Sequence, residues 1–426
     1  MAMRTVQNAK SKKRPAKVTP ARWVAYNTIR RTFDDESYTD RAFAAELERC
    51  KPPLDARDRA HAQALAYGVV QRAKTLDYVI AIVGKRPLRK IDGAVLHALR
   101  LGMFELLMRE NAAADAHAAV DQAVELVRGM VGERAVAFTN PILRRGQVDG
   151  AGIIAALDDT DDADLATRMS MPEWIVERMR ESYGDEGIAA LESFEQPRLG
   201  TPLRGNPLLI TSTELDAVLE ESGAALLDVP QPFATVEPMA RLVAGSLEPV
   251  RELIDRGLLQ PQAFASMLVT AALDPQPGER IVDMCAAPGG KTMHIAARMA
   301  GEGHITAVDI HHHRAKAISY LAAKVGASGI VNTRCADATK LTPADLGGNL
   351  ADRVLLDAPC SGLGVLDTRP DLRWRRNEDD IDGLVELQLA LLRAAAGLVR
   401  PGGLVLYSTC TMLPEENEQV VEQIVA

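Results

Sequence analysis

The chain has 426 residues, of which 47% are hydrophobic and 25% are charged, and this length allows roughly two to four globular domains. The composition excludes disorder throughout the chain, and because no run approaches about 20 apolar residues we expect no membrane-spanning helix. The net charge of −9 is unevenly divided: residues 1–146 carry 26 basic and 16 acidic side chains, and residues 147–426 carry 23 and 42. This asymmetry indicates either a polyanionic partner for the amino-terminal part or a solvated basic tail.

The amino terminus lacks the apolar core of a signal peptide, so we expect a cytoplasmic protein, and we expect it to be a monomer. Three consecutive histidines at 311–313 would point in different directions on a helix, so we expect no metal site there. The cysteines form an odd set without a C-x-x-C pair, which disfavours a disulfide framework and a zinc finger. They are Cys50, Cys285, Cys335, Cys360 and Cys410.

The first half of the chain predicts helices. Residues 1–20 are rich in Lys and Arg and contain two prolines, which predicts a disordered basic arm. Residues 21–146 have apolar side chains at helical spacing, as at positions 76, 79, 80 and 83, and predict a compact helical bundle. Residues 147–168 are small and acidic and predict a linker.

The second half predicts two further parts. Residues 169–270 have mixed character, with helices over 172–183 and 211–223 and a weak strand over 201–206, and predict a connecting α/β subdomain. In residues 271–426 short apolar runs alternate with helices, which predicts an α/β, Rossmann-like domain with a parallel, doubly wound sheet. The expected strands are 281–284, 305–308, 330–333, 354–356 and 404–407, and the expected helices are 290–299, 312–325 and 383–399.

The strongest local pattern is residues 283–292, with the sequence DMCAAPGGKT, between the first expected strand and a helix. It is not a P-loop, because Cys285 stands where the first glycine is required, and the G-x-G-x-x-G fingerprint is also absent. Asp309 at the tip of the next strand suits the ribose hydroxyls of a nucleoside. These features favour a nucleoside cofactor without a pyrophosphate, most commonly S-adenosylmethionine; a bare strand-to-helix turn is the alternative.

Four segments resemble signature motifs of the Nol/Nop/Sun family of RNA cytosine-C5 methyltransferases: residues 283–292, 357–364 (DAPCSGLG), 369–374 (RPDLRW) and 407–411 (YSTCT). The amino-terminal half resembles a NusB-type domain. The segments that carry this second resemblance are 58–60, 65–68, 75–78, 117–121, 137–140 and 143–145. The combination is similar to the RsmB (Sun, Fmu) branch of the family, which implies methylation of small-subunit (16S) ribosomal RNA.

The resemblance also implies roles for individual residues. C5 of cytosine is a weak nucleophile, and addition of a thiolate to C6 makes it reactive. The family pattern makes Cys410 the attacking nucleophile and Cys360 the group that helps to clear the adduct. Asp357 can hydrogen-bond N3 or the amine of a flipped base. The expected contacts of S-adenosylmethionine are Cys285, Ala286, Ala287, Pro288, Gly289, Gly290, Lys291, Asp309, Asp337 and Asp357.

Three points stay open at the level of sequence. Arg373, Arg375 and Arg376 around Trp374 suit phosphates and unpaired bases, or form a solvated loop. The family usually has an acid at position 263, where this chain has alanine after Gln262. Sheets of this type normally add two more strands after the fifth, so the chain is either truncated or covers its sheet edge differently.

Two alternative functions remain. A transfer RNA cytosine-C5 methyltransferase would use the same chemistry, but a NusB-like half favours ribosomal RNA. A non-catalytic RNA-binding or ribosome assembly factor could keep the fold, but the two cysteines in their motifs disfavour it. Methylation of an exocyclic amine would require an Asn/Asp-Pro-Pro-aromatic motif where this chain has 357–360.

Overall fold

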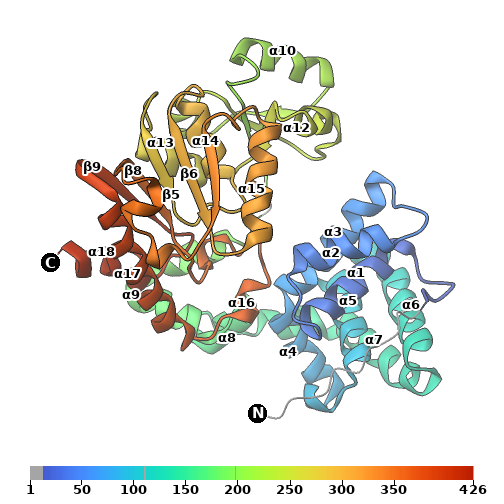
Figure 1. The fold of residues 1–426 in the computed structure, drawn as a ribbon. Coiled ribbons are helices and arrows are strands. Elements are labelled where there is room, and N and C mark those ends of the chain that lie inside the picture. Colours follow the sequence, from blue (N-terminus) through green and yellow to red (C-terminus); the bar gives the residue numbers. More distant parts are fainter. Residues whose placement is uncertain (1–12, 110–111, 197, 426) are drawn as a thin grey trace. The chain divides into compact units, whose positions relative to one another are not determined.

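The computed structural model describes residues 13–109, 112–196 and 198–425. Its internal contacts form two compact units, and each is described by itself. We call Met1–Glu195 with Val365–Asn377 the helical unit, and Gln196–Gly364 with Glu378–Ala426 the sheet unit. The chain therefore leaves the sheet unit after Gly364, contributes a short segment to the helical unit, and returns. Figure 1 shows the elements of both units.

Helices make up the regular structure described in the helical unit, which confirms the predicted bundle. The buried core includes Leu65, Leu76, Ile80 and Leu99, which come from three different helices. Asp55 and Asp92 cap two of these helices by accepting hydrogen bonds from backbone N–H groups in their first turns. The helices are α1 (Pro20–Phe33), α2 (Thr39–Arg49), α3 (Ala56–Gln71), α4 (Ala73–Gly84), η1 (Leu88–Lys90), α5 (Gly93–Leu107), α6 (Ala112–Met130), α7 (Glu133–Ala155), α8 (Asp162–Arg168), α9 (Glu173–Ser193) and α16 (Leu372–Arg375).

The segment predicted as a linker, residues 147–168, is largely helical, because α7 continues to Ala155 and α8 follows. The reason is close packing. A Cβ added to Gly146 would lie 2.2 Å from Cε of Met103, and one added to Gly150 would lie 2.9 Å from Leu107. Glycines here let α7 approach α5, so they do not end the helix.

Residues 1–12 of the predicted basic arm lie outside the described residues. The rest of the arm packs on the helical unit: Val18 is fully buried, and the Thr19 N–H donates to Oε1 of Gln122 at 2.8 Å. Nε2 of Gln122 in turn donates to the carbonyl of Lys17 at 2.9 Å. Residues 17–19, which were predicted to be part of the arm, therefore belong to the packed helical unit.

The sheet unit begins with an antiparallel sheet in the order β2-β3-β1-β4. Its first strand, β1 (Thr201–Gly205), matches the strand expected at 201–206 despite Pro202. The other elements of this part are α10 (Ser212–Ser222), β2 (Leu226–Leu227), α11 (Phe233–Val236), β3 (Ala240–Val243), η2 (Glu248–Val250), α12 (Arg251–Asp255) and β4 (Leu259–Pro261).

A parallel sheet in the order β7-β6-β5-β8-β9 forms the rest of the unit and confirms the doubly wound prediction (Figure 1). All five expected strands and three expected helices are present within a few residues. The strands are β5 (Arg280–Asp283), β6 (His304–Asp309), β7 (Val331–Cys335), β8 (Ala351–Asp357) and β9 (Val399–Ser408). The helices are α13 (Phe264–Leu273), α14 (Gly290–Arg298), η3 (Ala338–Lys340), η4 (Pro343–Leu346), η5 (Leu363–Val365), α15 (His312–Lys324), α17 (Asp380–Leu398), η6 (Pro414–Glu416) and α18 (Glu418–Val425).

Neighbouring residues of β5 point into opposite layers, as strand geometry requires. Ile281 packs in a core with Met293 of α14 and Ile318 of α15. Val282 packs in the other core with Leu391 of α17. Helices thus cover both faces of the sheet.

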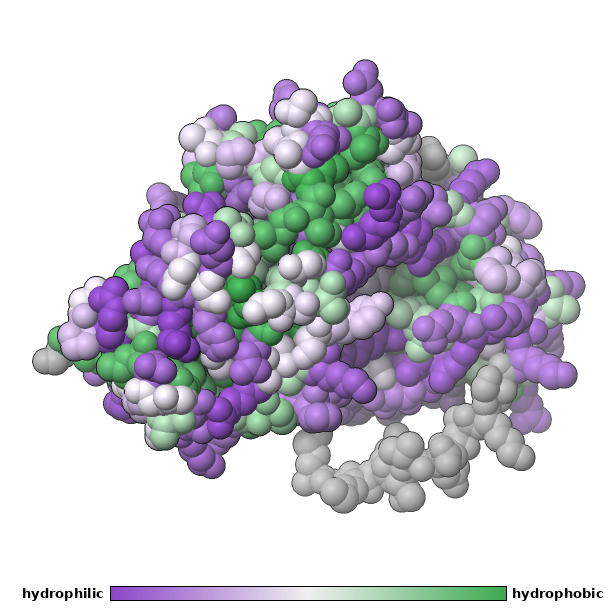
Figure 2. All heavy atoms as spheres, turned by 45° about the horizontal axis from the view of Figure 1, so that its top comes forward, coloured by the Kyte–Doolittle hydropathy of each residue, from purple (hydrophilic) through white to green (hydrophobic). Residues whose placement is uncertain are grey.

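The order of the strands reverses between β5 and β8, so their carboxyl ends border the crevice where ligands bind in such sheets. β9 is the edge strand of the sheet formed by the described residues. The two further strands that sheets of this type normally add are not found in the described part of the chain. No described helix is long and apolar enough to cross a membrane. The face drawn in Figure 2 mixes hydrophilic side chains with several apolar patches.

Candidate active site

The loop after β5 leaves open space for a ligand beside its backbone. Gly289 precedes α14 and has a φ of +107°, a backbone conformation that residues with a Cβ atom rarely adopt. A Cβ added to the next residue, Gly290, would meet no atom within 4 Å. The turn formed by residues 284–289 therefore exposes backbone groups at the amino end of a helix, and this fits the approach of a cofactor.

Asp283 at the end of β5 is completely buried beneath this loop. Thr292 Oγ1 donates to its Oδ2 at 2.7 Å, while Oδ1 has no hydrogen-bond partner among the described residues. Burial raises the pKa of Asp283 to about 7. Sequence reasoning used Asp283 only to mark a motif and missed this unusual carboxyl group.

The next strands bring two predicted residues to the same edge. Asp309, which is 7% exposed, accepts the His311 N–H at 2.8 Å after β6. Asp337 follows β7, where it accepts the Thr339 N–H at 3.1 Å. Ile310, the residue after Asp309, exposes 60% of its surface. An apolar side chain beside an acid at the end of a strand fits the face of an adenine. The sequence analysis missed Ile310, although its position after Asp309 was a usable signal.

Asp357 at the end of β8 joins the cofactor loop to the cysteine loops. Its Oδ2 lies 2.7 Å from Nζ of Lys291, and its Oδ1 accepts a hydrogen bond from Ser408 Oγ at 2.9 Å. The carboxylate is thus held in a fixed orientation by a cation from α14 and a hydroxyl from β9. These residues fit a nucleoside cofactor, because open space, acids and an apolar side chain lie along one sheet edge.

The structure brings Cys360 and Cys410 together. Their sulfur atoms are 3.3 Å apart, beyond the S–S length of about 2 Å of a disulfide, and the Cys410 N–H donates to Cys360 Sγ. Cys360 is half-buried and Cys410 is exposed. The hydrogen bond with Cys410, followed by burial, raises the pKa of Cys360. Two thiols at neighbouring strand ends can address one small planar substrate.

The other cysteines have different surroundings. Burial raises the pKa of Cys285 to about 12, so its thiol stays protonated and the loop contributes through its backbone. Cys335 is exposed at the end of β7, and Cys50 lies in the helical unit. Among the described residues no group of three or more His, Cys, Asp or Glu side chains could hold a metal ion.

Arg373 and Trp374 do not form the exposed nucleic-acid cluster that was one reading of their sequence. Arg373 is 1% exposed, and it donates to the backbone carbonyls of Gln71, Ser170 and Leu366. The indole of Trp374 donates to the carbonyl of Val70 at 2.6 Å. These side chains anchor Val365–Asn377 inside the helical unit.

Gln262, which precedes the missing acid, is buried in the sheet unit. Its Oε1 accepts a hydrogen bond from Arg204 Nε at 2.8 Å, and its Nε2 donates to Ser266 Oγ at 3.3 Å. It therefore belongs to an internal polar network that ends β4 and begins α13.

Comparisons with known proteins agree with this geometry. The family model described as 16S rRNA methyltransferase RsmB/F matches residues 270–426, and the NusB family model matches residues 19–147. A protein of Synechocystis named probable ribosomal RNA small subunit methyltransferase B is 34% identical over 417 residues, which cover 95% of this chain and 88% of that protein. The chain belongs to the RsmB/F methyltransferase family. The resemblance to RsmB-type proteins is thereby confirmed.

Solved structures share the fold of this RsmB/F family member. The protein called PH0851 is 26% identical with a TM-score of 0.78, and the match covers 97% of this chain and 90% of that one. NSun6 from Pyrococcus horikoshii, solved with SFG, is 25% identical with a TM-score of 0.51, covering 60% of this chain and 87% of that one. The Rossmann-like prediction is confirmed by these likenesses and by the order of the strands.

Proposed function

We propose that the protein uses S-adenosylmethionine to methylate C5 of a specific cytosine in 16S ribosomal RNA through a covalent adduct with Cys410. The observation that carries this proposal is the pair of sulfur atoms 3.3 Å apart, beside Asp357 and the open loop after β5. Two thiols at such a distance suit a reaction in which one attacks and the other assists release. The name of the Synechocystis relative and the family description support ribosomal RNA as the substrate.

The cofactor site supports S-adenosylmethionine. Its sulfonium supplies an electrophilic methyl group, and the relative NSun6 was solved with SFG, an analogue of this cofactor. Asp309 would accept hydrogen bonds from the ribose hydroxyls, Asp337 would lie on the adenine side, and Ile310 would contact the base. The backbone of residues 285–291 would hold the methionine part against the turn at Gly289.

The chain's own residues divide the reaction into steps. The Cys410 thiolate would form a bond to C6, and C5 would use the displaced electron pair to bond the sulfonium methyl group, whose carbon–sulfur bond breaks to leave a thioether. Bonding of Cys410 to C6 removes the hydrogen bond that is the main cause of the raised Cys360 pKa, so Cys360 can lose its proton to solvent and then, as a thiolate, remove the C5 proton. The C6–sulfur bond breaks, the ring regains its aromaticity, and Cys410 leaves as a thiolate. Asp357, which Lys291 and Ser408 hold in a fixed orientation, would accept a hydrogen bond from the cytosine amine.

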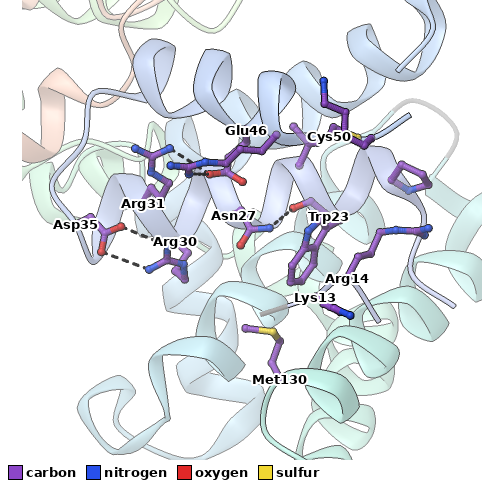
Figure 3. A pocket seen from close by; sticks show the side chains of 14 residues that line it. Lys13, Arg14, Trp23, Asn27, Arg30, Arg31, Asp35, Glu46, Cys50 and Met130 are labelled. Atoms are coloured by element: carbon purple, nitrogen blue, oxygen red, sulfur yellow. Dashed lines mark hydrogen bonds and ion pairs between the residues drawn. The ribbon is translucent and has the colours of Figure 1, made fainter. Parts of the chain in front are cut away.

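A basic pocket in the helical unit supports an RNA partner. The pocket has a volume of about 870 Å³ and contains six basic and two acidic side chains, in a chain whose net charge is −9. Trp23 lies among basic side chains that come from the segment before α1, from α1 and from the end of α2 (Figure 3). Cations and an aromatic ring together suit the phosphates and bases of unpaired RNA. The basic residues are Lys13, Arg14, Arg30, Arg31, Arg49 and Lys51.

The decisive experiment is incubation of the protein with 16S ribosomal RNA, and separately with transfer RNA, in the presence of S-adenosylmethionine labelled in its methyl group. We expect 5-methylcytosine at one position of the ribosomal RNA. Label only in transfer RNA would select the alternative enzyme, and RNA binding without any label would select the non-catalytic assembly factor. Label on an exocyclic amine would contradict the roles of both thiols.

A further inference from the structure

Glu416 is a charged residue that is completely buried next to the two thiols. Its Oε1 accepts hydrogen bonds from the Ser361 N–H at 2.8 Å and from Nε2 of Gln388 at 3.0 Å. Its Oε2 accepts a hydrogen bond from Ser361 Oγ at 2.5 Å. A buried carboxyl group needs hydrogen-bond partners, so this cluster is built around the two oxygen atoms of Glu416.

Glu416 is linked to the immediate neighbours of both cysteines, directly to Ser361 and through Ser361 to Thr411. Ser361 follows Cys360, and Thr411 follows Cys410. Ser361 Oγ lies 2.7 Å from Thr411 Oγ1, so one hydroxyl bridges the carboxylate and the second cysteine loop. Two loops that are fifty residues apart in the sequence are thereby joined one residue beyond each sulfur atom.

The Cys360 loop depends on Glu416 more than the Cys410 loop does. Gln388, itself fully buried on α17, uses its amide group to hold both Glu416 and the carbonyl of Pro359, which precedes Cys360. Cys410 instead lies two residues after the end of β9, its carbonyl accepts the Gly364 N–H at 2.8 Å, and the preceding Thr409 hydroxyl donates to Oδ1 of Asn417 at 2.5 Å. Loss of the carboxylate would therefore release Cys360 while leaving Cys410 anchored.

We propose that Glu416 is a positioning residue that holds Cys360 in place for release of the RNA adduct, acting through Ser361 and its link to Thr411. Glu416 does not reach the substrate, since its carboxylate is enclosed by these donors. The inference rests on the proposed covalent mechanism and adds to it the element that sets the relative placement of the two thiols. A misplacement of about 1 Å at a reacting group can cost about 10²-fold in rate.

The test compares attack with release. RNA that contains 5-fluorocytosine traps the adduct, because fluorine replaces the C5 proton that Cys360 would remove, so trapping measures attack by Cys410 alone. Glu416→Ala should trap this RNA at close to the wild-type rate. On ordinary RNA it should release product about 10- to 100-fold more slowly, so that a methylated adduct accumulates.

Four further variants separate positioning from folding. In Glu416→Gln the amide oxygen can still accept from Ser361, and the amide can donate to the Ser361 hydroxyl, so release should recover. Thr411→Val removes only the hydroxyl link and should slow release, whereas Thr411→Ser should restore it. Glu279→Ala is the control: it removes a half-buried acid that precedes β5 and pairs with Arg353, at the end of β5 opposite to the thiols, and it should leave release unchanged.

The outcomes distinguish this inference from the proposed function. If the wild-type protein forms neither adduct nor 5-methylcytosine, the covalent mechanism fails and the inference with it. If the wild-type protein does both and Glu416→Ala releases product normally, only the inference is overturned. Equal loss of trapping and release in Glu416→Ala and Thr411→Val would reduce Glu416 to a general structural role.

Discussion

Replacement of Asp283 by asparagine tests the electrostatics of the cofactor loop. Asparagine has the same shape, can accept the Thr292 hydroxyl through its oxygen, and does not ionise. In the folded protein burial raises the pKa of Asp283 to about 7, from 3.8 for an unperturbed aspartate. The native state therefore binds a proton that the unfolded state has released at neutral pH.

The sign and size of the effect follow from this difference. The stability that Asp283 contributes is fully present below about pH 4 and is lost progressively as the pH rises to about 7, because the native carboxyl must then ionise in its buried position. The rise of the Asp283 pKa from 3.8 to about 7 corresponds to about 4 kcal/mol of unfolding free energy. Asp283→Asn should match the wild-type stability at pH 4 and exceed it by up to about 4 kcal/mol at pH 8.

The positions of the tryptophans allow the two units to be followed separately. Trp23, Trp174 and Trp374 all belong to the helical unit, so their fluorescence reports the unfolding of that unit. Urea unfolding should be followed by fluorescence and by far-ultraviolet circular dichroism between pH 4 and pH 8. The substitution should move only the transition that tryptophan fluorescence does not detect.

Asp352 provides a control of opposite sign. The hydrogen bond from the Arg280 N–H and the bond from Arg400 lower the pKa of Asp352, so its contribution is present above the unfolded pKa and is lost as the pH falls. Asp352→Asn should therefore destabilise the protein at both pH 4 and pH 8, and its effect should shrink only as the pH falls below 3.8. Equal destabilisation by Asp283→Asn at both pH values would refute the reasoning about Asp283.

Three further substitutions or deletions test other parts of the account. Asp309→Ala should weaken binding of S-adenosylmethionine by about 1–3 kcal/mol, and an unchanged dissociation constant in calorimetry would contradict its ribose contact. Arg373→Ala should destabilise the helical unit by about 2–4 kcal/mol in fluorescence-detected unfolding, because three backbone carbonyls lose their donor. A smaller effect on the helical unit than on the sheet unit would contradict the anchoring role of Arg373. Deletion of residues 1–12 removes Arg4, Lys10 and Lys12 and should make RNA binding less dependent on salt without changing the methylated nucleotide; a new methylation site would show that the arm selects the target.

The sequence was most informative where a physical pattern is local. Apolar runs bounded by Gly, Asp and Pro identified all five parallel strands, because a buried strand needs only a few consecutive apolar residues. The same local reasoning predicted a linker over residues 147–168 from their small and acidic side chains. In the structure α7 continues to Ala155, because Gly150 permits close packing against Leu107 of α5.

Contacts between distant residues were beyond sequence reasoning. The sequence left Arg373 and Trp374 as either a nucleic-acid site or a solvated loop, because three of their four hydrogen-bond partners lie about 200 to 300 positions earlier in the chain. The link from Glu416 to Ser361 spans 55 positions and depends on the pairing of β8 with β9. The motifs placed Cys360 and Cys410 after adjacent strands, but the separation of 3.3 Å required the structure.

The most direct test of the central claim is a denaturing gel of the wild-type protein and its cysteine variants after incubation with ribosomal RNA and labelled S-adenosylmethionine. Cys360→Ala should give a labelled protein–RNA adduct that survives denaturation, because attack and methyl transfer proceed while release fails. Cys410→Ala and the double variant should give no adduct and no methylated RNA. An adduct that appears only in Cys410→Ala would assign the attack to Cys360 and contradict the account.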